Sequence, residues 1–141
     1  MLRFSKKVEY ALIAMLHMAS ENQRKLSTAK ELSHRYHIPL ELMGKVLQRL
    51  SKQGLVESVQ GIKGGYKLKR PLSDISISEI LETVDGPFKL VNCMEQKNNT
   101  LCDQHVNCTI KNPMGIIQSR LESLFDELKL QDIEKDLRSV L

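Results

Sequence analysis

The chain has 141 residues, with 21 Lys and Arg against 17 Asp and Glu and a formal net charge of +4. That length suits one compact domain, or a small domain with an appended interaction element, and is short for most self-contained enzymes. No apolar run approaches the ~20 residues that a membrane span requires, and the first residues lack the apolar core of a signal peptide. We therefore expect a cytoplasmic protein with no membrane partner.

The charge is distributed unevenly along the chain. Residues 1–70 carry 14 Lys and Arg against 5 Asp and Glu, a net charge of +9, whereas residues 71–141 carry 7 against 12, a net charge of −5. A basic N-terminal half indicates contact with a polyanion, and an acidic C-terminal half indicates a different task. A surface that is merely patchy in charge is the simpler interpretation, and it weakens if the basic half also shows a nucleic-acid-binding pattern.

Capping residues and apolar spacing predict three helices in the basic half. Ser5 can cap the first helix, and the capping-box spacing of Thr28 and Glu31 predicts the start of the second. Pro39 disfavours helical geometry at the residue before it, so a third helix can begin after a tight turn and end at Gly54. The predicted helices span residues 5–20, 28–36 and 40–53.

The third helix has an apolar face and a polar face, and it is followed by a basic hairpin. The apolar face consists of Met43, Val46, Leu47 and Leu50. Two short strand candidates, LVESVQ and GYKLKR, lie on either side of GIKG, whose glycines suit a turn with unusual backbone angles. Helix, turn, helix and hairpin predict a winged helix-turn-helix within a mainly α fold.

The acidic half begins with a short helix and ends with a long one. Ser76 and Glu79 again have capping-box spacing, and Asn112 followed by Pro113 predicts the N-cap and first residue of the long helix. Its apolar stripe predicts dimerisation, with packing on the protein's own core as the alternative. The stripe consists of Met114, Ile117, Leu121, Leu124 and Leu128. The predicted organisation is a DNA-binding domain (1–70), a connecting helix and cysteine loop (71–112), and the dimerisation helix with a last helix (113–141).

The outer face of the third helix and the wing supply the predicted DNA contacts. Only side chains on the outer face of a helix in the major groove can reach base edges. The predicted base contacts are Glu41, Lys45 and Gln48, with Ser51 as a further candidate. Gly44 either lets the backbone approach DNA closely or is merely tolerated. The predicted phosphate and wing contacts are Lys6, Lys7, Arg49, Lys52, Gln60, Gly61, Lys63 and Lys67, some of which will simply form a solvated surface.

All three cysteines lie in the stretch CMEQKNNTLCDQHVNC, at positions 93, 102 and 108. In a reducing compartment a cluster of cysteines indicates metal binding or thiol redox chemistry rather than a disulfide framework. Three thiolates leave a four-coordinate site one protein ligand short. The candidates for the fourth ligand are Glu9, His105, Asp103 and Glu95.

These patterns together resemble the Rrf-type family of winged-helix iron–sulfur transcriptional regulators, with its IscR-like and NsrR-like branches. The resemblance covers nearly the whole chain. It rests on FSKKVEYALIAMLHMA, on IPLELMGKVLQRLSKQGLVESVQGIKGGYKL, on ISISEILETVDGP, and on three cysteines before a long C-terminal helix. It implies a homodimer that binds double-stranded DNA at a palindromic operator.

The resemblance also implies the cofactor and its ligands. An iron–sulfur cluster, with four irons or two, would be held by Cys93, Cys102 and Cys108. In the NsrR-like branch an acidic residue of the first helix supplies the fourth ligand from the other subunit, and Glu9 occupies that position; His105 is the alternative. The IscR-like branch uses a histidine at the position where this chain has Lys111. The cluster would sense nitric oxide, redox state or iron supply, and the regulator would act as a repressor.

Two other functions remain open from the sequence. A winged-helix regulator could use zinc or reversible thiol oxidation in place of a cluster, and a redox or cluster-carrying protein could use the winged helix for protein contacts. An enzyme is the weakest interpretation, because no nucleophile-and-base arrangement or phosphate-binding glycine loop is present. We expect no catalytic residues.

Overall fold

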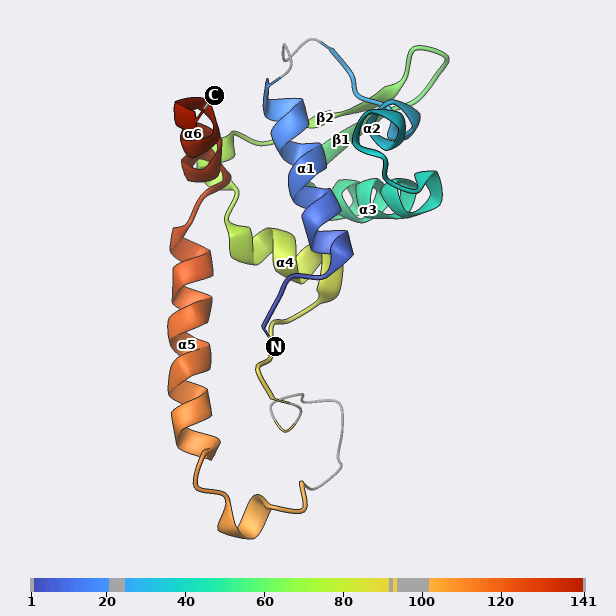
Figure 1. The fold of residues 1–141 in the computed structure, drawn as a ribbon. Coiled ribbons are helices and arrows are strands. Elements are labelled where there is room, and N and C mark those ends of the chain that lie inside the picture. The colour runs from blue at the N-terminus through green and yellow to red at the C-terminus, as the bar shows by residue number, and fades with distance from the viewer. Residues whose placement is uncertain (1, 21–24, 92, 94–101, 141) are drawn as a thin grey trace.

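The computed structural model describes residues 2–20, 25–91, 93 and 102–140. It confirms a mainly α winged helix-turn-helix with a two-stranded sheet (Figure 1). None of the helices in these residues has the length and apolar character needed to cross a membrane. The elements are α1 (Lys6–Ser20), α2 (Ala29–Tyr36), α3 (Leu40–Lys52), β1 (Val56–Val59), β2 (Gly65–Leu68), η1 (Leu72–Asp74), α4 (Ile77–Asp85), η3 (His105–Asn107), α5 (Lys111–Glu127) and α6 (Leu130–Val140).

Three helices begin at the caps that the sequence predicts. The hydroxyl of Ser5 accepts the N–H of Val8 at 3.3 Å at the start of α1. Thr28 accepts the N–H of Glu31 at 3.0 Å before α2, and Ser76 accepts the N–H of Glu79 at 3.1 Å before α4. Each cap satisfies a backbone donor that has no partner within its helix.

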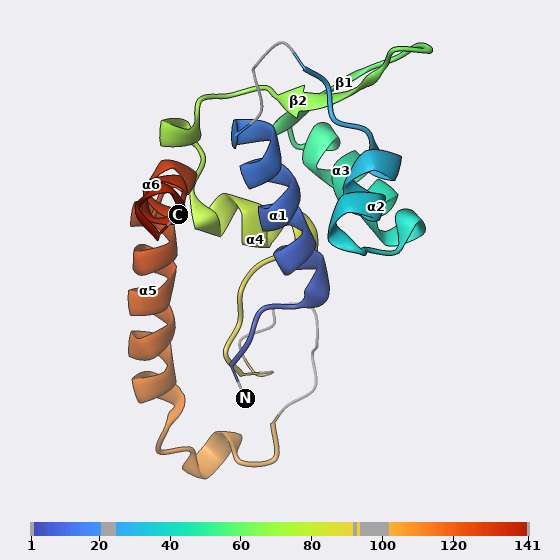
Figure 2. The same cartoon turned by 45° about the horizontal axis from the view of Figure 1, so that its top comes forward.

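The wing is an antiparallel hairpin in which Val56 pairs with Leu68 and Val59 with Gly65. Tyr66 also forms an isolated bridge to Ser27, which ties the wing to the segment before α2. The turn is tight, since a Cβ on Gly64 would lie 2.2 Å from the carbonyl oxygen of Val59. The hairpin is therefore fixed to the helical core at one end and projects from it at the other (Figure 2).

The core lies between α1, α3 and α4. Helix α1 packs against both of the others, and its Ala14 and Met15 are fully buried. Helix α3 contributes Leu47 and Leu50 to the same cluster, and α4 contributes Ile80. Burial of this apolar surface is the main favourable contribution to folding.

The end of the chain returns to this core. The N–H of Ile77 donates to the carbonyl of Leu128 at 3.0 Å, and the N–H of Leu130 donates to Ile75 at 2.9 Å. Leu130 itself is fully buried, whereas α5 extends away from the core toward the cysteine loop (Figure 1). Backbone hydrogen bonds therefore join the segment that leads into α4 to the segment that leads into α6.

Helix α5 begins earlier than the sequence predicts. Its first residue is Lys111, its N-cap is Ile110, and no side chain caps it. The N–H of Met114 already donates to the carbonyl of Ile110 at 2.8 Å, so Asn112 lies within the first turn and not before it. Pro113 is tolerated there because a first-turn N–H has no helical acceptor. The prediction of Asn112 as the N-cap was wrong.

A substitution pair tests the tight wing turn. We expect Gly64→Ala to lower the free energy of unfolding by roughly 1 to 3 kcal/mol, because the added methyl group meets a backbone oxygen that cannot move cheaply. Gly44→Ala is the matched control in an open position of α3, and it should raise that free energy by up to about 1 kcal/mol. Urea unfolding at one fixed protein concentration measures both. Equal stability of the two variants would contradict the turn geometry.

Candidate nucleic-acid interface and cysteine loop

Helix α3 buries its apolar face and exposes the opposite one. The buried side chains are Met43, Val46, Leu47 and Leu50. The other face carries Glu41, Lys45 and Gln48, all exposed, with Gly44 partly buried between them. The structure thus brings the predicted base contacts together on one accessible helix face. Such a face can enter a major groove.

Two of these side chains form a pair in the free protein. The ammonium of Lys45 donates to Oε1 of Glu41 at 2.9 Å, one helical turn away. This hydrogen bond and the positive charge hold the pKa of Glu41 below its usual value. Both side chains are more than half exposed, so the pair contributes little to stability and can exchange for DNA contacts at low cost.

The turn between α2 and α3 fixes the direction of α3. His37 adopts a left-handed conformation with φ 54°, and the N–H of Ile38 donates to the carbonyl of Ser33 at 3.0 Å. The hydroxyl of Ser33 donates back to the carbonyl of Ile38 at 2.5 Å. Ile38 is buried, so the turn is anchored both by polar bonds and by apolar packing.

The tip of the wing is open to solvent. Gln60, Gly61 and Lys63 are exposed there, as a DNA-contacting wing requires, and Gln60 donates to the hydroxyl of Ser58 at 3.1 Å. Ile62 is fully exposed at the same tip. It was not among the predicted contacts, although an apolar residue between polar ones in a turn was visible in the sequence.

The predicted phosphate contacts differ in their surroundings. The exposed ammonium of Lys6 lies 2.8 Å from Oε2 of Glu9, and this hydrogen bond raises the pKa of Lys6. Lys7 and Lys52 are exposed. Lys67 lies 3.6 Å from the carboxylate of Glu57 across the wing. These lysines remain available to an anionic partner.

Arg49 has a partner inside the protein. Its Nη1 donates to the carbonyl oxygen of Val84, in the last turn of α4. No local sequence pattern indicates this contact, because 35 residues separate the two positions. Arg49 therefore links the recognition helix to α4, whether or not it also approaches DNA.

The cysteine loop leaves α4 and rejoins the protein at α5. Its three cysteines are free thiols, Cys93 exposed and the other two partly buried. Cys93 lies against the first turns of α5, where Lys111 and Gly115 line the same shallow hollow. The thiol of Cys102 donates to Oε1 of Gln104 at 3.1 Å, and Cys108 follows the short helix η3.

The candidates for the fourth ligand lie on different elements of the chain. Glu9 lies in the first turn of α1, His105 is the first residue of η3, and Asp103 is exposed. Glu95 lies outside the residues that the structure describes. Within the described part of the chain, no three His, Cys, Asp or Glu side chains are grouped so as to hold a metal ion. Three free thiols with a carboxylate or an imidazole are chemically suited to bind iron or zinc.

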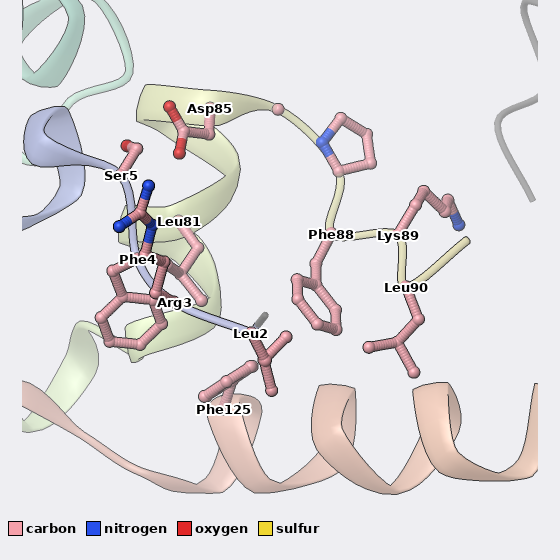
Figure 3. Close-up of a pocket in the computed structure, with 12 residues that line it drawn as sticks. Leu2, Arg3, Phe4, Ser5, Leu81, Asp85, Phe88, Lys89, Leu90 and Phe125 are labelled. Carbon is pink, nitrogen blue, oxygen red and sulfur yellow. The ribbon is translucent and has the colours of Figure 1, made fainter. Parts of the chain in front are cut away.

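A hollow of about 780 Å³ lies between the N-terminal segment, the end of α4 and α5 (Figure 3). The ring of Phe125 on α5 is 6.0 Å from that of Phe4 and 5.7 Å from that of Phe88, which it meets edge-on. Arg3 and Asp85 lie at its rim. The hollow marks the place where the segment before α1, the end of α4 and the long helix α5 meet.

Comparisons with known proteins agree with this architecture. The sequence model of the Rrf2 family, described as an iron-dependent transcriptional regulator, matches residues 4–136. The HTH-type transcriptional regulator NsrR of Shouchella clausii is 27% identical over 143 residues, covering 99% of this chain and 95% of its own. A putative rrf2-like HTH-type transcriptional regulator of Rhodobacter capsulatus is 31% identical over 135 residues, covering 92% and 90%.

Solved structures show the same fold. IscR of T. potens has a TM-score of 0.73 and 25% identity, covering 96% of this chain and 88% of that one. CymR, titled the global cysteine regulator of B. subtilis, has a TM-score of 0.74 and 21% identity, covering 96% and 98%. At the identity of CymR the likeness concerns the fold alone.

The surroundings of Gly44 lead to a prediction about DNA binding. A glycine in mid-helix costs about 1 kcal/mol relative to alanine, and no described atom lies close enough to a Cβ at this position to require glycine. We therefore expect close approach of DNA to be the reason, and Gly44→Ala to weaken DNA binding about tenfold while stabilising the fold. Fluorescence anisotropy with a labelled duplex measures the affinity. Unchanged affinity would mean that the glycine is merely tolerated.

The pair on α3 predicts a pKa change. We expect Lys45→Ala to raise the pKa of Glu41 toward its usual value, because the donor and the positive charge are both removed. In the wild type, the small stabilisation from this pair is present at neutral pH and is lost as the pH falls through the lowered pKa. Carbon-13 NMR titration of the Glu41 carboxylate measures the shift. Lys52→Ala is the control and should leave it unchanged.

Proposed function

Since the chain belongs to the Rrf2 family of transcriptional regulators, we propose that its DNA affinity is controlled by an iron–sulfur cluster at the cysteine loop of a homodimer. The chain is a DNA-binding regulator and not an enzyme. In the proposed function it represses transcription at a palindromic operator. The signal is nitric oxide, redox state or the supply of iron and clusters.

One observation carries the proposal. Three free thiols lie in a single loop between a DNA-binding unit and a long helix with exposed apolar side chains. Soft thiolate ligands select iron–sulfur clusters, copper(I) and zinc, and the description of the matching Rrf2 family model as an iron-dependent regulator favours the iron–sulfur cluster within that group. When bound, the cluster supplies iron that reacts with nitric oxide or oxygen, or that is lost when iron is scarce.

In the proposed site Cys93, Cys102 and Cys108 hold the cluster, and Glu9 of the partner subunit completes it. The Glu9 side chain is 44% exposed and pairs with the flexible ammonium of Lys6, so it can leave that partner at little cost. A carboxylate is a harder ligand than a thiolate, and the iron that it holds should be the most reactive. His105 is the alternative ligand from within the loop.

The proposal of a homodimer rests on the exposed apolar side chains of α5. Ile116, Ile117 and Leu124 are each between 44% and 58% exposed, and Gln118 is the one buried residue of this helix. Ile117 and Leu124 are seven residues apart, which places them on the same face of the helix, and exposed apolar side chains arranged in this way are expected to pack against a partner. A dimer also provides two recognition helices for the two halves of a palindrome.

A thiol-based regulator is the second candidate, because the three free thiols suit it as well. It predicts a colourless protein whose DNA affinity changes with thiol oxidation. The proposed cluster predicts visible colour after anaerobic purification. The colour of a single anaerobic preparation therefore distinguishes the two candidate functions.

The test is anaerobic purification of the wild type, Glu9→Ala and His105→Ala, with iron, sulfide and zinc analysis and visible spectroscopy. We expect a coloured wild type, and a Glu9→Ala protein with an altered spectrum and a faster loss of colour under nitric oxide. DNA affinity should fall at least about tenfold when the cluster is removed from the wild type. The duplex is one selected from a random pool by the anaerobic protein.

Glu57→Ala is the control for the spectrum, because it removes an exposed glutamate from the wing, where the thiols do not lie. A colourless wild-type protein that contains zinc or no metal would contradict the cluster. If Glu9→Ala left the visible spectrum and the reaction with nitric oxide unchanged while His105→Ala altered them, His105 and not Glu9 would be the fourth ligand.

A further inference from the structure

The contact between Arg49 and Val84 joins the recognition helix to the end of α4. Arg49 lies in the last turn of α3, and its guanidinium reaches the backbone of another helix rather than an acidic side chain. Val84 is 1% exposed. A buried backbone carbonyl without a partner is costly, so this hydrogen bond has a structural purpose beyond surface charge.

The end of α4 explains why an arginine is needed there. Gly86 closes the helix by donating its N–H to the carbonyl of Glu82 at 2.9 Å. The carbonyls that follow, including that of Val84, point out of the last turn and have no N–H donor within α4. A guanidinium is suited to this position, since it is always protonated and is favoured by the negative end of the helix dipole.

The chain that leaves this helix end is held against α5. Gln118 is 5% exposed, and its amide donates to the carbonyl of Phe88 at 2.9 Å. Its Oε1 accepts the N–H of Leu90 at 3.0 Å, so one side chain binds the backbone of this segment at two points. A further bond from Gln118 to Oε1 of Glu122, at 2.8 Å, fixes the amide in this orientation.

Aromatic packing supports the same segment. Phe88 points from the segment toward Phe125 on α5 (Figure 3), and the two rings meet edge-on at 5.7 Å. Three residues after Leu90 comes Cys93. The segment Val84–Leu90 is therefore held by Arg49 at one end and by Gln118 at the other, and it leads into the first thiol.

We infer that Arg49 and Gln118 are positioning residues through which the state of the cysteine loop sets the placement of the recognition helix. The inference rests on the proposed cluster-controlled DNA binding and concerns how that control is transmitted. A change at Cys93 moves a segment that is fixed to α5 by Gln118, and the other end of the segment holds α3 through Arg49. Arg49 thus affects DNA affinity through α3, and not as a phosphate contact.

The test compares Arg49→Gln with the wild type by two quantities. The first is the ratio of DNA affinity between the cluster-loaded and the cluster-free protein. The second is the slope of log affinity against log salt concentration. We expect Arg49→Gln to lower the ratio at least about fivefold and to leave the slope unchanged. The duplex is the one selected from a random pool by the anaerobic wild type.

Lys52→Gln is the matched control, because it removes one exposed positive charge from the same end of α3. It should reduce the steepness of the salt dependence by about 0.9 and leave the ratio unchanged. Gln118→Leu tests the other end of the segment without changing any charge, and it should lower the ratio in the same way. Affinities are expressed per intact cluster from the iron and sulfide content, and circular dichroism verifies folding.

Two results would overturn the inference alone. One is a wild-type ratio well above one that persists in both Arg49→Gln and Gln118→Leu. The other is an Arg49→Gln protein that behaves as Lys52→Gln does, which would make Arg49 a phosphate contact. A wild-type ratio near one would overturn the proposed function, and the inference with it.

Discussion

The burial of α1 between α3 and α4 is the interaction on which the rest of the structure depends. Val8, Ala11, Ala14 and Met15 of α1 are at most 1% exposed. They support α3, whose opposite face is the candidate DNA surface, and α4, whose end begins the cysteine loop. Because α1 supports both α3 and α4, a displacement of one of these helices affects the other, since the close-packed interior between them does not deform freely.

The elements that could be predicted from the sequence are those with local causes. Thr28 and Ser76 cap their helices through hydrogen bonds that reach three residues ahead, and such a spacing is visible in any linear pattern. The buried face of α3 follows from apolar residues three and four apart. The prediction of the N-cap of α5 was wrong because Asn112 and Pro113 are equally compatible with a first turn that begins earlier.

The parts of the candidate site that escaped prediction depend on contacts distant in sequence. Arg49 was predicted as a phosphate contact because a cation beside a recognition helix usually has no closer partner, and the Val84 carbonyl is 35 residues away. Gln118 donates to the carbonyl of Phe88, 30 residues away. This contact was not predicted, because a polar residue in an exposed helix is ordinarily solvated. The three cysteines could be predicted as a candidate site because they lie close together in the sequence. No local pattern specifies which side chain would be the fourth ligand.

The burial of Leu130 has a consequence for how the protein is made. Leu130 belongs to the same core cluster as residues of α1 and α3, and its backbone bonds to Ile75. On a ribosome, the DNA-binding unit cannot complete its interior until α6 has left the exit tunnel. By then the cysteine loop and α5 have already emerged. The apolar interior that supports the candidate DNA surface of α3 is therefore complete only after the cysteine loop and α5 have been synthesised.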